Sequence, residues 1–157
     1  MVTLMLEHGH VSFMEFYQGR VRKGNYFSDL ELFRLAENVL SALIYLQGIG
    51  MLGMFHHEML FLTLNRNYKS LHPLLFPLFH QSQECPETPI SQSVFDFGYL
   101  LLNIALLEPA LKPVNSYNLE QSYLETKVQI LTATISSKII HMLQICLQSD
   151  STSRPSL

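Results

Sequence analysis

SVFDFGYLLLNIALL, residues 93–107, is the most apolar stretch of the chain. Only Ser93, Asp96, Gly98 and Asn103 interrupt its apolar side chains, and it contains no proline. A helix that is hydrophobic nearly all round is buried among other elements. A membrane span is disfavoured, because crossing a bilayer takes about 20 uncharged apolar residues and Asp96 and Asn103 leave fewer. We therefore predict a buried central helix around which other helices pack.

Length and composition favour a single domain, residues 1–157, with a substantial core. Hydrophobic residues make up 48% of the chain and charged residues only 15%, against a charged fraction of about 25% in ordinary domains. So low a charge indicates either a large buried fraction or an apolar surface that needs a partner. The net charge of -3 disfavours nucleic acid as the main ligand.

The two cysteines, Cys85 and Cys146, are too few and too far apart for a disulfide framework. The first residues also lack the charged, apolar and small-residue regions of a signal peptide. We therefore expect an intracellular, reducing location, most simply the cytoplasm.

The clearest helix signal upstream of the central helix begins at Ser28. Ser28 and Glu31 have the spacing of a capping box. Apolar residues then recur at helical spacing, and Gly48 and Gly50 are expected to end the helix; these apolar residues are Leu32, Leu35, Ala36, Val39, Leu40, Leu43 and Leu46.

The remaining elements are expected to be short. We predict a strand over residues 1–7, a short helix over 11–18 closed by Gly19, and a loop over 20–28. Residues 58–64 and 68–71 form a predicted β-hairpin, because the intervening Asn65-Arg66-Asn67 suits a tight turn. Two further helices are expected over 119–131 and 135–147, followed by a polar, Ser-rich terminal motif at 148–157.

This order of elements resembles the C-terminal lobe of a protein kinase. Glu84-Cys85-Pro86-Glu87 is similar to the family's A-P-E motif, and residues 92–98 to the S-D-x-[WFY]-S-x-G pattern that follows it. CLQSDSTSRPS, residues 146–156, is similar to the ending C-L-x-x-D-P-x-x-R-P-S, with Ser151 in place of the proline. The resemblance covers almost the whole chain and implies a mainly α, kinase-like C-lobe with a small hairpin.

The resemblance also implies an ion pair between Glu87 and Arg154, the family's link from the A-P-E motif to the end of the lobe. The literal Asp96-Phe97-Gly98 is spelled like the magnesium-binding motif of kinases. Because apolar helical sequence continues directly after it, we interpret this motif as a coincidence within the central helix.

The positions that carry chemistry in kinases hold other residue types here. In one register of the catalytic loop, Phe55 replaces the catalytic Asp and Leu60 the magnesium-binding Asn; in the register shifted by one, Met54 and Met59 do. His72 stands near the second magnesium position, where a hard oxygen ligand is needed. No Gly-rich phosphate loop or V-A-I-K strand occurs, and the resemblance places Met1 near the family's hinge strand, so the nucleotide-covering lobe is expected to be absent.

Other candidate sites are weaker. His56-His57-Glu58 does not match a zinc motif, because Phe61 stands where the second ligand is required. We therefore predict no metal and no cofactor. The basic residues after position 19, with Tyr17 and Tyr26, could contact an acidic partner, although a solvated loop is the simpler interpretation; they are Arg20, Arg22 and Lys23.

The predicted function is that of a catalytically inactive, kinase-like domain that binds or scaffolds another protein. Apolar surface over residues 1–6 and 55–62 is expected to hold that partner or a second copy of the chain. One alternative is a piece of a longer serine/threonine kinase, in which an upstream lobe restores ATP binding. Another is an unrelated helical adaptor.

Overall fold

The computed structural model describes residues 11–52, 55, 57–70, 90–111 and 119–157. The strand expected over 1–7 and the Glu84–Glu87 motif lie outside these residues, as do Met54 and His72. The described part is mainly helical, in agreement with the predicted fold class.

The small sheet has three antiparallel strands, β1 (Val11–Ser12), β2 (Leu60–Leu62) and β3 (Tyr68–Ser70), in the order β1-β2-β3. The β2–β3 hairpin confirms the sequence prediction, and Arg66 rather than an asparagine takes the positive φ of 58° in its turn. Strand β1 was not predicted: Val11 and Ser12 pair with Leu62 and Phe61 in place of starting the expected helix. A strand of two residues leaves no detectable alternation in the sequence.

Helix α1 (Phe13–Lys23) is longer than predicted, and the loop expected over 20–28 begins only after Lys23. The helix continues through Gly19, whose surroundings are open. It ends at Gly24, which takes a left-handed φ of 61° while the N–H groups of Gly24 and Asn25 donate to Val21 and Arg20. This is a Schellman ending, in which glycine is favoured because it lacks a Cβ.

Helix α2 (Asp29–Gly48) begins with the predicted capping box. The Ser28 hydroxyl accepts from the Glu31 N–H at 3.4 Å, and the Ser28 N–H donates to Glu31 Oε2 at 2.9 Å. Gly50 follows the helix with φ 71°, close to the predicted end. The stripe of apolar residues that faces the core is buried as predicted, except that Leu40 is half-buried.

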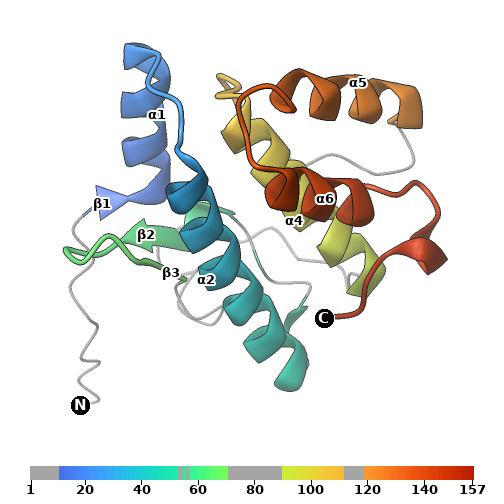
Figure 1. The fold of residues 1–157 in the computed structure, drawn as a ribbon. Coiled ribbons are helices and arrows are strands. Elements are labelled where there is room, and N and C mark those ends of the chain that lie inside the picture. Colours follow the sequence, from blue (N-terminus) through green and yellow to red (C-terminus); the bar gives the residue numbers. More distant parts are fainter. Residues whose placement is uncertain (1–10, 53–54, 56, 71–89, 112–118) are drawn as a thin grey trace.

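The predicted central helix is α4 (Ile90–Ala105), which begins three residues earlier than expected. Ten of its 16 residues are buried, and it contacts α2, α5 and α6 (Figure 1). Asp96-Phe97-Gly98 lies inside the helix, where Asp96 is exposed and accepts from Gln92 Nε2 at 2.7 Å. The motif is therefore helical, as predicted, and not a loop.

The C-terminal half adds α5 (Gln121–Leu131), α6 (Ser137–Cys146) and the 3-10 turn η5 (Ser151–Ser153). Both helices fall within the predicted ranges. Figure 1 shows α6 lying along α4, with the chain end returning to the start of α4. One hydrophobic core joins residues from the sheet and from all of the α-helices named above. Within the described ranges, no helix combines the length and the apolar character that a bilayer crossing requires.

Candidate functional site

The positions that resemble the kinase catalytic loop are packed with apolar side chains. Met59 is completely buried and Leu60 is 2% exposed, so both belong to the core. Phe55 is half-buried and packs against the same core. Thioether, aliphatic and phenyl groups offer no hard oxygen ligand to magnesium and no base to an attacking hydroxyl. Met54 and His72 lie outside the described residues.

This packing also corrects one sequence expectation. The apolar surface predicted over residues 55–62 is not exposed, because Met59 and Leu60 are buried while Phe55, Phe61 and Leu62 are half-buried. The sheet and η2 (His57–Met59) pack against α1, which covers these side chains. Of these residues, Leu62 also lines a cavity beside α1 and the start of α2.

Arg154, predicted as a structural residue, ties the end of the chain to the start of α4. Its guanidinium donates to three backbone carbonyls, those of Gln148 at 2.7 Å, Ser91 at 2.9 Å and Ser149 at 3.2 Å. The guanidinium carbon also lies 4.7 Å from the centre of the Phe95 ring. Glu87 is not among the described residues, so its ion pair with Arg154 stays a prediction.

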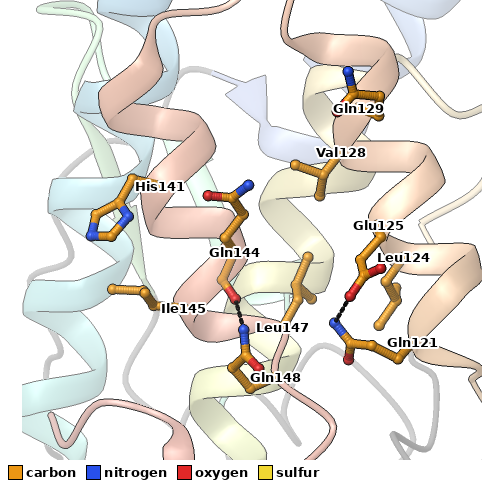
Figure 2. Close-up of a pocket in the computed structure, with 10 residues that line it drawn as sticks. All are labelled: Gln121, Leu124, Glu125, Val128, Gln129, His141, Gln144, Ile145, Leu147 and Gln148. Atoms are coloured by element: carbon orange, nitrogen blue, oxygen red, sulfur yellow. Dashed lines mark hydrogen bonds between the residues drawn. The ribbon is translucent and has the colours of Figure 1, made fainter.

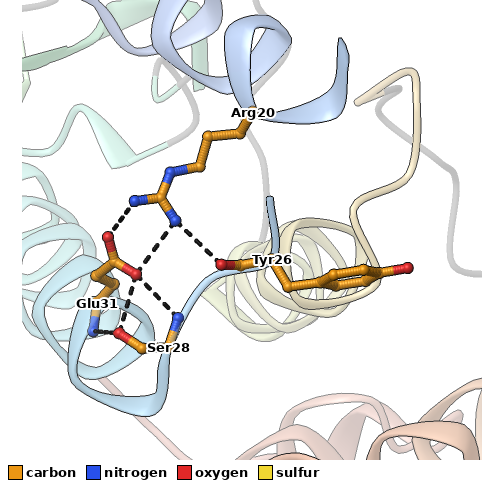
Figure 3. A network of polar contacts seen from close by, with 4 residues as sticks. All are labelled: Arg20, Tyr26, Ser28 and Glu31. Atoms are coloured by element: carbon orange, nitrogen blue, oxygen red, sulfur yellow. Dashed lines mark hydrogen bonds and ion pairs between the residues drawn. The ribbon is translucent and has the colours of Figure 1, made fainter. Parts of the chain in front are cut away.

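A second polar network joins α1 to α2 (Figure 3). Arg20 of α1 forms a two-pronged ion pair with Glu31 and donates to the Tyr26 carbonyl at 3.2 Å. The same guanidinium lies 4.4 Å from the centre of the Phe27 ring and 5.1 Å from that of Phe16. The burial of Glu31 raises its pKa, but hydrogen bonds from Arg20 and Ser28 outweigh this and hold the pKa below its usual value. Glu31 thus stays ionised and Arg20 fixed.

Beside this network lies a cavity of about 470 Å³ between α1, the start of α2 and the β2–β3 hairpin. Its lining combines three arginines with apolar and aromatic groups: Phe16, Arg20, Ser28, Leu30, Glu31, Arg34, Leu62, Arg66 and Tyr68. Burial, aided by the charge of Glu31, raises the pKa of Tyr68 to about 12. No sequence motif marks Arg34 and Arg66 as site residues, because only the fold brings the hairpin next to α2.

The other basic and aromatic residues singled out near Arg20 have different places. Arg22 and Lys23 are exposed on α1 and do not line the cavity. Tyr17 is 1% exposed and its hydroxyl donates to the Glu108 carbonyl at 2.6 Å, beyond the end of α4. The Tyr26 ring is 65% exposed and points away from the polar network (Figure 3).

A shallow groove of about 520 Å³ lies between α5 and α6 (Figure 2). Two of its glutamines already donate hydrogen bonds to residues four positions away in the sequence. Gln121 Nε2 donates to Glu125 at 3.2 Å, and Gln148 Nε2 to the Gln144 carbonyl at 2.8 Å. The groove has no concentration of like charge or of nucleophiles that would indicate a ligand class.

Metal and thiol chemistry find no support in the described ranges. No three His, Cys, Asp or Glu residues there come close enough together to hold a metal ion. Cys146 is a free, buried thiol whose pKa is raised to about 11 by burial, which leaves it protonated and unreactive near neutral pH.

A scan against models of protein families found no match to the chain, and a search of curated proteins found no significant match either. The kinase resemblance therefore rests on the motifs and on the order of elements.

Proposed function

We propose that the chain is a kinase-like C-lobe that does not transfer phosphate and works by binding another protein. One observation carries this proposal: the described positions that resemble the catalytic loop hold apolar side chains, with Met59 and Leu60 buried and Phe55 half-buried against the core. These side chains supply no carboxylate or amide oxygen for magnesium and no base for an attacking hydroxyl.

The order of elements supports the kinase-like part. A short helix, a capped long helix, a hairpin, a buried helix and two further helices follow one another as the resemblance implies. Arg154, in the motif that resembles the family's ending, holds that ending against Ser91 at the start of α4.

Exposed apolar side chains support the binding part. Large hydrophobic residues are more than half exposed at the start of α2 and in the hairpin turn, namely Leu30 at 62% and Leu64 at 76%. Contiguous apolar surface rimmed by polar residues marks protein-binding sites, and Leu30 lies beside Arg20 and Arg34 in the lining of one cavity. The free Cys146 thiol supports action in a reducing compartment such as the cytoplasm.

The test is a thermal melt of the purified chain with ATP and magnesium together, with each alone, and with an active kinase as a positive control. A ligand that binds only the folded state adds about 2.7 kcal/mol at 100 times its Kd, which for a domain of this size raises the Tm by roughly 5–10 °C. We expect no shift. A clear shift with ATP and magnesium would overturn the proposal and favour a nucleotide-binding kinase fragment.

A further inference from the structure

We propose that the arginine-lined cavity beside Arg20 binds an acidic segment of a partner protein that also carries a bulky apolar residue. This inference rests on the proposed protein-binding function and names the chemistry of the partner. We call this cavity, whose nine lining residues come from α1, α2 and the hairpin, the arginine cavity.

The charge of the arginine cavity is the first argument. Three guanidinium groups line it against one carboxylate, Glu31, and that carboxylate is already engaged by Arg20. Arg34 and Arg66 are both exposed, and neither forms an ion pair with another residue that the structure describes. The chain as a whole carries a net charge of -3, so this local excess of positive charge favours an anionic occupant.

The apolar lining is the second argument, because it separates a peptide from a simple anion. Phe16 and Leu62 are half-buried and Leu30 is largely exposed. A small inorganic anion would leave these side chains in water. A volume of about 470 Å³ is of the size that accepts several groups of a ligand at once. In a peptide ligand, an apolar side chain would cover Leu30 and Leu62, and acidic residues on either side of it would bind the arginines.

The rigidity of one wall is the third argument. Arg20 is fixed by Glu31 and by the rings of Phe16 and Phe27, and the Tyr68 N–H donates to Asn38 Oδ1 of α2 at 2.8 Å. Two further positive charges line the same cavity, those of Arg34 on α2 and of Arg66 in the hairpin turn. A guanidinium binds a carboxylate through two parallel hydrogen bonds. A rigid wall that faces two arginines without an ion pair to any described residue therefore suits recognition of acidic side chains.

The test selects ligands without assuming a sequence. The full chain is immobilised and panned against a phage-displayed library of random peptides. We expect selected peptides to be enriched in Asp or Glu next to Leu, Ile or Phe. The double variant Arg34→Glu/Arg66→Glu is panned in parallel and is expected to lose these peptides and to select Lys or Arg in their place. Arg22→Glu, which reverses an exposed arginine outside the cavity, should select the same peptides as the parent.

A second measurement gives the size of the effect. Binding of the best selected peptide, labelled with fluorescein, is followed by polarisation. Arg34→Gln and Arg66→Gln should each weaken it about tenfold, and raising the salt concentration should weaken it further. These neutral variants also keep the test decisive if charge reversal prevents folding, which a thermal melt of each variant would reveal.

Several results would overturn the inference. One is the absence of any enriched peptide. Another is enrichment that is unchanged in the double variant Arg34→Glu/Arg66→Glu. Preferential binding of RNA or of anionic vesicles to the parent in the same polarisation format would assign a different occupant. So would concentration-dependent dimerisation that Arg34→Glu abolishes. These results are independent of the thermal melt with ATP and magnesium. Failure of the peptide-binding inference can therefore be distinguished from failure of the proposed function.

Discussion

At the scale of single residues, the packing of the central helix depends on Gly98. A Cβ placed on Gly98 would lie 2.7 Å from the Cβ of Cys146 and 3.3 Å from Cγ of Leu147. The Cβ of Cys146 is fixed by the backbone of α6 and cannot swing aside as the end of a long side chain can. The absence of a side chain at Gly98 therefore sets how closely α4 and α6 approach.

We predict that Gly98→Ala destabilises the chain by about 1–3 kcal/mol, because the added methyl group overpacks the α4–α6 contact. The measurement is urea denaturation followed by circular dichroism. Gly19→Ala is the matched control, since Gly19 is also helical but has open surroundings. There alanine should stabilise by about 0.5–1 kcal/mol. Equal effects at the two glycines would contradict the packing argument.

Ionisation of Tyr68 should lower the stability of the fold at alkaline pH. Burial and Glu31 raise its pKa from 10.0 to about 12, so its neutral form stabilises the fold fully below about pH 10, and this contribution is lost as the pH rises toward about 12. Between neutral pH and about pH 11, the free energy of unfolding of the parent should fall by about 1 kcal/mol more than that of Tyr68→Phe. Denaturation series at several pH values measure this. Identical pH profiles would refute it, and the exposed Tyr26→Phe serves as the control.

At the scale of elements, Arg154 joins η5 and the preceding turn to α4. We predict that Arg154→Ala destabilises the chain by about 2–4 kcal/mol, because three carbonyls lose a charged donor and Phe95 loses its stacked partner. Arg154→Lys should recover only part, since an ammonium cannot reproduce the planar fork. Arg22→Ala, at an exposed arginine, should change stability by less than about 0.5 kcal/mol. Similar values for Arg154→Ala and Arg22→Ala would favour the unrelated helical adaptor.

The predicted ion pair can be tested separately with a double-mutant cycle on Glu87→Gln and Arg154→Lys. A coupling energy of about 0.5–3 kcal/mol is expected for residues in one network. A coupling near zero would show that the two charges are independent and would remove one support of the kinase resemblance.

The elements that the sequence predicted are those with strong local signals. The capping box at Ser28 and the apolar periodicity after it define α2, and the nearly continuous apolar run defines α4. The end of α4 has no glycine: Leu107 takes the left-handed φ of 57° shortly before Pro109. Its N–H and that of Glu108 donate to Ile104 and Asn103 in the pattern of a Schellman ending.

The candidate site was less predictable than the helices. Arg20 belongs to a cluster of basic residues in the sequence, but its neighbours in that cluster lie outside the cavity. Arg34 and Arg66 are far apart along the chain. They line one cavity only because the hairpin packs against α2. Contacts between distant segments of this kind have no signature in residue spacing.

At the scale of the whole molecule, the described part forms one core around α4, and this core includes positions at which the kinase resemblance would place chemistry. Leu60 pairs through β2 with Ser70 of β3 and is buried beneath α1. At the described positions where the kinase resemblance would place catalytic groups, the chain therefore has apolar packing that stabilises the whole fold.

The stability of Leu60→Asn tests this claim most directly. In one of the two registers of the kinase resemblance, this position corresponds to the magnesium-binding asparagine. In a core, asparagine leaves a cavity and buries an unpaired amide. We predict a loss of about 3–5 kcal/mol in urea denaturation, while Leu64→Asn, at a leucine that is 76% exposed, should change stability by less than about 0.5 kcal/mol. If Leu60→Asn instead leaves stability within about 1 kcal/mol of the parent, Leu60 is not a core residue and the claim is contradicted.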